Sequence, residues 1–144
     1  VKVAKAATVQ VRYQVHNDDG GGAVAASDGR FTITRPKAVL SGSVQTAGPA
    51  SVHVGRIELA ECTSTYQPAK ASVHEFAEIE SAAAHSHVIL TVAAASPAGT
   101  TPGALKITAI DGGWRVSGTH GGRTVDLSVY CQKDAVPEVT VSKA

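Results

Sequence analysis

Alternation of apolar and polar side chains is the main pattern in this chain. Residues 8–16 place Val or Tyr at every second position, and residues 30–35 alternate around Phe31 and Ile33. Successive side chains of a strand point to opposite faces, so this period of two predicts strands with one buried and one wet face. Other segments with strand character are 39–44, 52–59, 88–92, 105–110, 114–119, 124–131 and 136–141.

Turn residues between these segments predict how the strands are joined. Asp111–Gly113 and His120–Gly122 contain residues that tolerate positive φ, so they predict tight hairpins on both sides of a central strand. Two longer connections, at 46–49 and 96–103, contain Gly and Pro and predict two further hairpins. These would pair 39–44 with 52–59, and 88–92 with 105–110.

Residues 69–84 fit two interpretations. They include good helix formers at helical spacing, but Val73, Ala77 and Ile79 also fit a period of two. We favour a strand over Val73–Ile79, followed by a turn of helix or a loop over Ser81–Ala84.

Regularly spaced short strands without intervening helices predict the fold class. We expect an all-β, single-domain antiparallel β-sandwich, or an open barrel, of eight or nine strands over residues 1–144. Strand-like tails at 1–6 and 136–141 flank it, and Pro137 would confine the second tail to a sheet edge. Hydrophobic residues make up 43% of the chain and aromatic residues only 4%, so the core must consist mainly of Val, Ile, Leu and Ala.

Charge and hydropathy exclude several classes of partner. The 13 basic and 12 acidic residues leave a net charge of +1, and the basic residues are scattered, so we expect no nucleic-acid binding. No segment reaches 18 consecutive apolar residues, so we expect no transmembrane segment. The chain has no methionine, and we expect a signal or lipid anchor upstream of Val1 in a longer precursor.

The two cysteines, Cys62 and Cys131, lack the CxxC spacing of a redox or zinc site. In a β-rich chain they predict a structural disulfide, and the alternative is a pair of buried, reduced thiols. Trp114 begins a strand, and we expect it to pack in the core against this bridge. A disulfide would indicate an extracytoplasmic location.

The carboxy-terminal half also carries a recognisable order of segments. An apolar strand, a glycine-rich connection, an Asp-Gly-aromatic-basic stretch and a closing strand that ends in cysteine follow one another. They are Val88–Val92, Pro97–Gly103, Asp111–Thr119 and Leu127–Cys131, and Leu40–Val44 with Thr46-Ala47 precedes them.

This order resembles the mycobacterial nineteen-kilodalton lipoprotein antigens and their actinobacterial relatives, over residues 31–131. That family has its first cysteine where this chain has Gln45, so the bridge would be relocated to Cys62, and no acylated cysteine is present. The resemblance implies an envelope-anchored or shed β-sandwich without an assigned enzymatic activity.

His85-Ser86-His87 is the sharpest candidate for chemistry. Residues i and i+2 of a strand share a face, so His85 and His87 could hold one Cu or Zn ion, with His74 and Glu75 completing the site. The alternative, which we favour, is two exposed surface histidines.

A disulfide sandwich with an HxH pair is also similar to copper-zinc superoxide dismutases. The isolated His53, His120 and Arg123 do not reproduce the ligand and arginine set of those enzymes. We therefore do not adopt a dismutase as the main interpretation.

Other polar motifs are better explained as turns. Asn17-Asp18-Asp19-Gly20 offers oxygen ligands for Ca²⁺, but the later glutamate of an EF-hand is missing, and these residue types favour turns. Asp111 likewise suits a hairpin. We find no nucleophile or phosphate-binding motif and expect no catalytic residue and no cofactor.

Three functions remain open. The first is a non-enzymatic, extracytoplasmic β-sandwich of the cell envelope, or a secreted antigen-like domain, that binds an unidentified protein or envelope partner. The second is a structural assembly protein, such as a filament subunit or viral surface protein, that forms homo-oligomers through edge strands. The third is a metal-binding or dismutase-like protein that uses His85 and His87.

Overall fold

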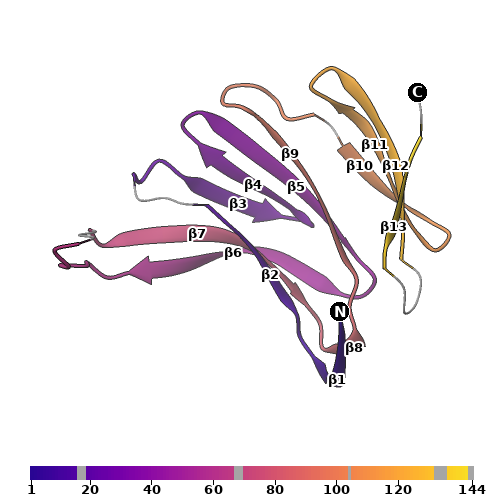
Figure 1. Ribbon diagram of the computed structural model, residues 1–144, viewed down its shortest axis with the longest axis horizontal. Coiled ribbons are helices and arrows are strands. Elements are labelled where there is room, and N and C mark those ends of the chain that lie inside the picture. The colour runs from indigo at the N-terminus through magenta and orange to yellow at the C-terminus, as the bar shows by residue number, and fades with distance from the viewer. Residues whose placement is uncertain (16–18, 67–69, 104, 132–135, 143–144) are drawn as a thin grey trace.

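The computed structural model describes residues 1–15, 19–66, 70–103, 105–131 and 136–142. The described residues form thirteen strands and no helix, arranged in three larger antiparallel sheets and a two-stranded ribbon (Figure 1). The predicted all-β antiparallel class is confirmed, although eight or nine strands is too low a number. The sheets do not close into a barrel.

The first sheet has the order β2-β7-β6. Its strands are β2 (Gln10–Gln14), β7 (Ser72–Ser81) and β6 (Ala50–Leu59). The strand predicted over Val73–Ile79 is therefore confirmed. Ser81 still belongs to β7, residues 82–83 form a short loop, and the next strand begins at Ala84. The loop predicted over Ser81–Ala84 is therefore confirmed for 82–83 only, and the helical alternative is wrong.

The second sheet has the order β3-β4-β5-β9. Its strands are β3 (Ala23–Ser27), β4 (Arg30–Arg35), β5 (Ala38–Thr46) and β9 (Ile89–Pro97). Apolar alternation in β3 rests on Val24 and alanines, which is too weak a signal to predict a strand from the sequence. Pairing with β4 along its whole length holds β3 in place.

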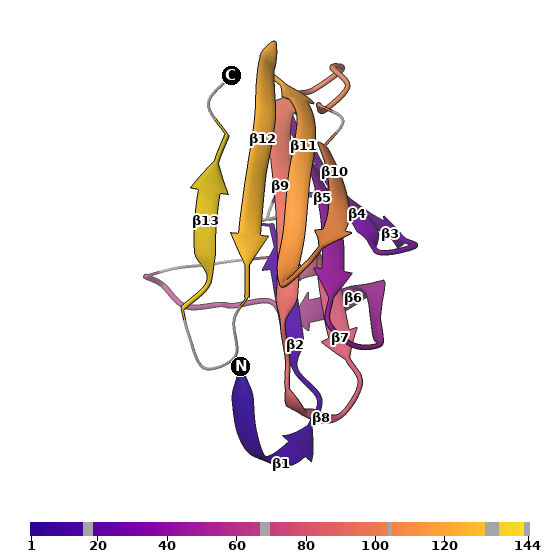
Figure 2. The same ribbon diagram turned by 90° about the vertical axis from the view of Figure 1, so that its right-hand side faces the viewer.

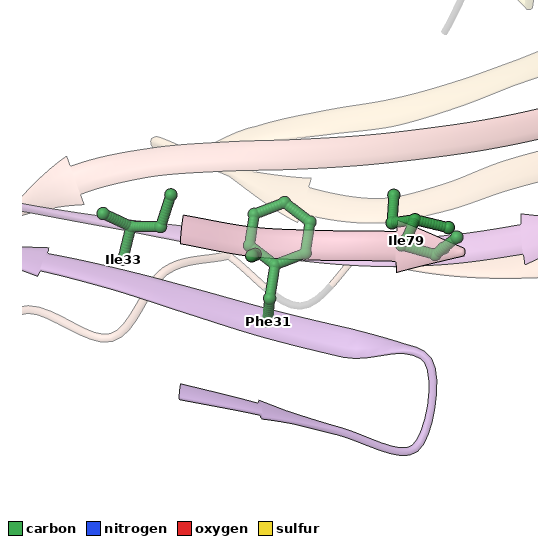
Figure 3. Close-up of a cluster of buried hydrophobic side chains, with 5 residues drawn as sticks. Phe31, Ile33 and Ile79 are labelled. Carbon is green, nitrogen blue, oxygen red and sulfur yellow. The ribbon is translucent and has the colours of Figure 1, made fainter. Parts of the chain in front are cut away.

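The main core lies between the facing sides of these two sheets. Phe31, Ile33 and Val44 meet Ala77 and Ile79, all of them buried. Figure 3 shows Phe31 and Ile33 pointing from β4 towards the sheet that holds Ile79. This face-to-face packing is the arrangement of a sandwich.

Gly42 of β5 explains how Phe31 fits into this core. A Cβ at Gly42 would overlap the ring of Phe31, which lies directly over the glycine backbone. The same ring stacks on Tyr13 of the first sheet, with 4.9 Å between ring centroids. Because Gly42 has no side chain, the ring of Phe31 has room to stack on Tyr13 and so to connect the two sheets.

The third sheet has the order β10-β11-β12-β13 and lies beside β5 and β9 (Figure 2). Its strands are β10 (Leu105–Ile110), β11 (Gly113–His120), β12 (Arg123–Tyr130) and β13 (Glu138–Val141). Both hairpins predicted around β11 are confirmed, and Gly112, Gly121 and Gly122 have the expected positive φ. Val116 and Val129 are buried on one face of this sheet.

The two predicted tails both form strands that pair within the same chain. β1 (Lys2–Ala7) pairs with β8 (Ala84–Ser86), and β13 pairs with β12. The amino-terminal ribbon lies at one end of the molecule, next to the ends of β2 and β9 (Figure 1).

Two predicted hairpins are wrong. β5 pairs with β4 and β9, while β6 pairs with β7, so the turn at 46–49 carries the chain from one sheet to the other. β9 and β10 likewise belong to different sheets. Local turn residues indicate a reversal of the chain, but they do not say whether the returning strand pairs beside its predecessor or packs across the core.

The described residues include no helix long and apolar enough to cross a membrane.

Candidate functional site

The predicted disulfide between Cys62 and Cys131 is not formed. Cys62 is exposed in the β6–β7 connection, and Cys131 is half-buried at the end of β12. These two places lie on opposite sides of the molecule (Figure 1). The physical reason is the topology, because β12 belongs to the third sheet and the β6–β7 hairpin extends away from it.

Trp114 is also placed differently from the prediction. It is half-buried rather than enclosed, and the bridge against which it was expected to pack is absent. It lies opposite Val129 on β12 and Ala109 on β10, on the same face as the buried Val116. Strand alternation therefore predicts its face correctly but not how completely that face is covered.

The histidines of the predicted metal site differ sharply in environment. His85 is exposed, whereas His87 is only 7% exposed, so the expectation that both lie at the surface is wrong for His87. His87 Nε2 donates a hydrogen bond to the carbonyl oxygen of Ala84 (3.0 Å), because a carbonyl can only accept. In the neutral ring Nδ1 then accepts from the hydroxyl of Ser81 (2.9 Å).

This histidine therefore belongs to a chain of hydrogen bonds that joins three segments. The hydroxyl oxygen of Ser81, on β7, accepts the backbone N–H of Val9 (2.9 Å), just before β2. The backbone of His87 exchanges two hydrogen bonds with Val1, each 2.8 Å long. We call Val1, Val9, Ser81, Ala84 and His87 the amino-terminal clasp.

A metal at His85 and His87 would have to replace one of the hydrogen bonds of the clasp. No group of three or more His, Cys, Asp or Glu side chains in the described residues is arranged to hold a metal ion. His74, expected to complete the site, is buried on β7, where its Nε2 contacts the hydroxyl of Ser72 at 3.0 Å. The metal site itself stays a prediction.

The acidic turn before β3 is described only from Asp19 onward, and Asn17 and Asp18 lie outside the described residues. The carboxylate of Asp19 accepts hydrogen bonds from Arg35 at 2.8 and 2.7 Å and from the N–H of Gly21 at 3.0 Å. The bond from Arg35 lowers the pKa of Asp19. Asp19 thus serves to join this turn to the end of β4.

A polar network that the sequence analysis did not single out crosses the outer face of the first sheet. Register places Arg12, Glu78 and His53 side by side on three neighbouring strands. The guanidinium of Arg12 donates to Glu78, and His53 Nε2 lies 3.0 Å from the other carboxylate oxygen. The Glu78 side chain is 8% exposed, while those of Arg12 and His53 are about half exposed.

Electrostatics explains how a buried carboxylate is tolerated in this network. The hydrogen bond from Arg12 lowers the pKa of Glu78, desolvation opposes it, and His53 adds a smaller lowering. Arg12 also covers the ring of Phe76, with 4.8 Å from the guanidinium carbon to the ring centroid. The available signal in the sequence is the row of polar residues at every second position of β2 and, apart from Phe76, of β7.

The outer strand of the third sheet, β13, forms an open sheet edge at which a partner could pair. Among the described strands it pairs with β12 alone. Val139 and Val141 are 58% and 69% exposed, although they lie opposite Val129 and Leu127 on the apolar face of the sheet. That face therefore continues past its buried part to an uncovered edge.

The backbone of β13 has a defined set of unpaired groups. Ser142 N–H donates to the carbonyl oxygen of Asp126 (3.0 Å), so Ser142 and Asp126 form a hydrogen-bonded pair. Such pairs alternate along antiparallel strands, so Thr140 and Glu138 also face β12. The N–H and C=O groups of Val139 and Val141 consequently point to the open edge.

Two other sheet edges, β6 and β3, are better protected than β13. β6 has charged Arg56 and Glu58 together with His53 along its length, and charged side chains discourage strand pairing. On β3 the N–H of Val24 is already used, because it donates to the carboxylate of Glu75 (3.0 Å). β13 has a single charged residue, Glu138, at its start.

No known protein family, curated protein or solved structure matches this chain. The resemblance to the lipoprotein antigens stays a prediction.

Proposed function

We propose that this protein is a non-enzymatic interaction domain that binds a polypeptide partner by strand pairing at β13. The observation that carries the proposal is the open edge itself, where four backbone groups of the exposed Val139 and Val141 have no partner among the described residues. Strand addition uses main-chain hydrogen bonds for affinity and the alternate side chains for specificity.

The valines supply the hydrophobic part of the driving force. Full burial of a valine side chain is worth at least about 1.5 kcal/mol. Val139 and Val141 are more than half exposed, and a strand at the edge would cover part of each, so their burial contributes at most on the order of 2 kcal/mol. Four backbone hydrogen bonds add to this, each with a modest net contribution.

An extracytoplasmic location, in the envelope or secreted, remains part of this proposal. It rests on the resemblance and on the strand pattern, since the cysteines are unpaired. The alternative of a structural assembly protein uses the same edge and differs in the identity of the partner.

A labelled peptide with the sequence of residues 136–142 tests strand pairing directly, by fluorescence anisotropy against the full chain. We expect it to bind, and we expect Val141→Pro to abolish binding while β13 stays paired with β12. Proline is tolerated on edge strands when its missing N–H would face solvent, as that of Val141 does.

The matched control is Val136→Pro, the same change just outside β13, and it should leave peptide binding unchanged. A scrambled peptide should not bind. Equal affinity of the wild type and Val141→Pro for the peptide would disprove pairing at this edge.

A further inference from the structure

We propose that the partner at this edge is β13 of a second copy of the chain, in a closed two-fold dimer. The inference rests on the proposed strand pairing and adds the identity and register of the partner. In this dimer Val139 of one copy lies opposite Val141 of the other, and the two Thr140 residues face each other across the symmetry axis.

Symmetry restricts the register to few choices. A two-fold axis perpendicular to a sheet keeps both apolar faces on the same side. Because opposed side chains must share a face, the axis lies between the two copies of one residue, and each register is named by that residue. The groups that point outward belong to Val139 and Val141, as the Ser142–Asp126 hydrogen bond establishes. An axis at Thr140 pairs these two residues with each other and forms four backbone hydrogen bonds.

The neighbouring register has poorer apolar contacts. An axis at Val139 would place Val141 opposite Pro137, which has no N–H to donate. Two of the six backbone hydrogen bonds possible in that register would be lost, which leaves four, the same number as with the axis at Thr140. The two registers therefore differ in their apolar contacts, because Val141 would face Pro137 instead of a valine. Like charges oppose each other in neither register, because Glu138 faces Ser142 with the axis at Thr140 and faces Thr140 with the axis at Val139.

The resulting dimer would extend the third sheet continuously from one copy to the other. Val139 and Val141 of both copies would join into one apolar strip on the side that already holds Val129. Because each copy uses the same edge, the assembly closes at two. A four-residue strand is small beside a standard interface of about 1,600 Å², so we expect a weak dimer, seen at high micromolar concentrations.

Charge reversal at the axis is the sharpest test. In this register the two Thr140 side chains lie directly opposite each other, so Thr140→Lys or Thr140→Asp alone places like charges together. Each variant alone should associate at least about tenfold more weakly than the wild type. An equimolar mixture of the two should restore the dimer, measured by sedimentation equilibrium over a concentration series.

Thr108→Lys and Thr108→Asp are matched controls. Thr108 is an exposed threonine on β10, at the opposite edge of the same sheet. Neither control should weaken association, and their mixture should not strengthen it. Circular dichroism and thermal melting of all four variants confirm that they are folded.

Several outcomes would overturn the dimer. A wild type that stays monomeric at every concentration while the 136–142 peptide binds would leave strand pairing intact but remove the second copy as the partner. Association beyond a dimer, or weaker association of the Thr108 variants than of the wild type, would indicate pairing of β13 with β10 in an open polymer. A monomer that also fails to bind the peptide would overturn the proposed function itself.

Discussion

A single buried carboxylate shows how one residue can control the pH response of this fold. Glu78 sits between Arg12 and His53, and the hydrogen bond from Arg12 is the main cause of its lowered pKa. A group whose pKa is lower in the folded than in the unfolded state stabilises the fold above its unfolded pKa. That contribution is lost as the pH falls through the folded pKa.

We therefore expect acid to destabilise the protein through Glu78 at pH values below its ordinary pKa of 4.5. Glu78→Gln should lower the Tm at neutral pH by a few degrees and flatten the fall of Tm with acid. Asp19 and Asp126 also have lowered pKa values, because of Arg35 and Arg115. Part of the fall of Tm with decreasing pH should therefore remain in Glu78→Gln.

The control for this prediction is Glu80→Gln, two residues along the same face of β7. It should change neither the Tm nor its pH dependence to a comparable extent. The Tm of both variants is measured from neutral to acid pH. If the Tm falls equally with acid in the two variants, the role of Glu78 is contradicted.

At the scale of elements, the amino-terminal clasp decides whether β1 stays attached. β1 pairs only with the three-residue β8 among the described strands, so side-chain hydrogen bonds must support it. Ser81 is 6% exposed and His87 is 7% exposed, and each uses its polar atoms inside the clasp. The pair therefore joins β7, β8 and the start of β2.

Removing the Ser81 hydroxyl should loosen this end of the molecule. Ser81→Ala leaves the N–H of Val9 and Nδ1 of His87 without partners, and each unsatisfied buried group costs about 1–3 kcal/mol. We expect a lower Tm and faster hydrogen exchange at the backbone of His87, which is bonded to Val1.

Ser86→Ala, an exposed serine on β8, is the control and should have little effect on either measurement. Hydrogen exchange followed by NMR separates a local opening of β1 from global unfolding. Identical protection of His87 in both variants would show that the clasp contributes little.

For the whole molecule, the separation of the cysteines is the clearest consequence of the topology. Cys62 and Cys131 are both free, and they are not equally accessible. We expect two thiols to react with Ellman's reagent under native conditions without reductant, with Cys62 reacting before the half-buried Cys131. Intact mass after alkylation in denaturant should show two modified thiols.

Single substitutions assign the two reactions. Cys62→Ser should remove the fast phase and Cys131→Ser the slow phase. A protein with no reactive thiol in denaturant would contradict the separation of the two sites.

The sequence by itself determined the local part of this fold. A period of two places Val9, Val11, Phe31 and Ile33 on the buried side of their strands, and the glycines after Asp111 and His120 make the hairpins on either side of β11. These features depend on neighbouring residues only, because side-chain alternation and positive φ are properties of a short stretch of backbone.

Only the tertiary structure decided which distant strands meet. The pairings of β2 with β7, β5 with β9 and β1 with β8 bring together residues far apart in sequence. Backbone hydrogen bonds are the same for almost every residue type, so sequence says little about which strands will share them. Packing of whole faces makes that choice, and with it the burial of His87, the separation of Cys62 from Cys131 and the open edge at β13.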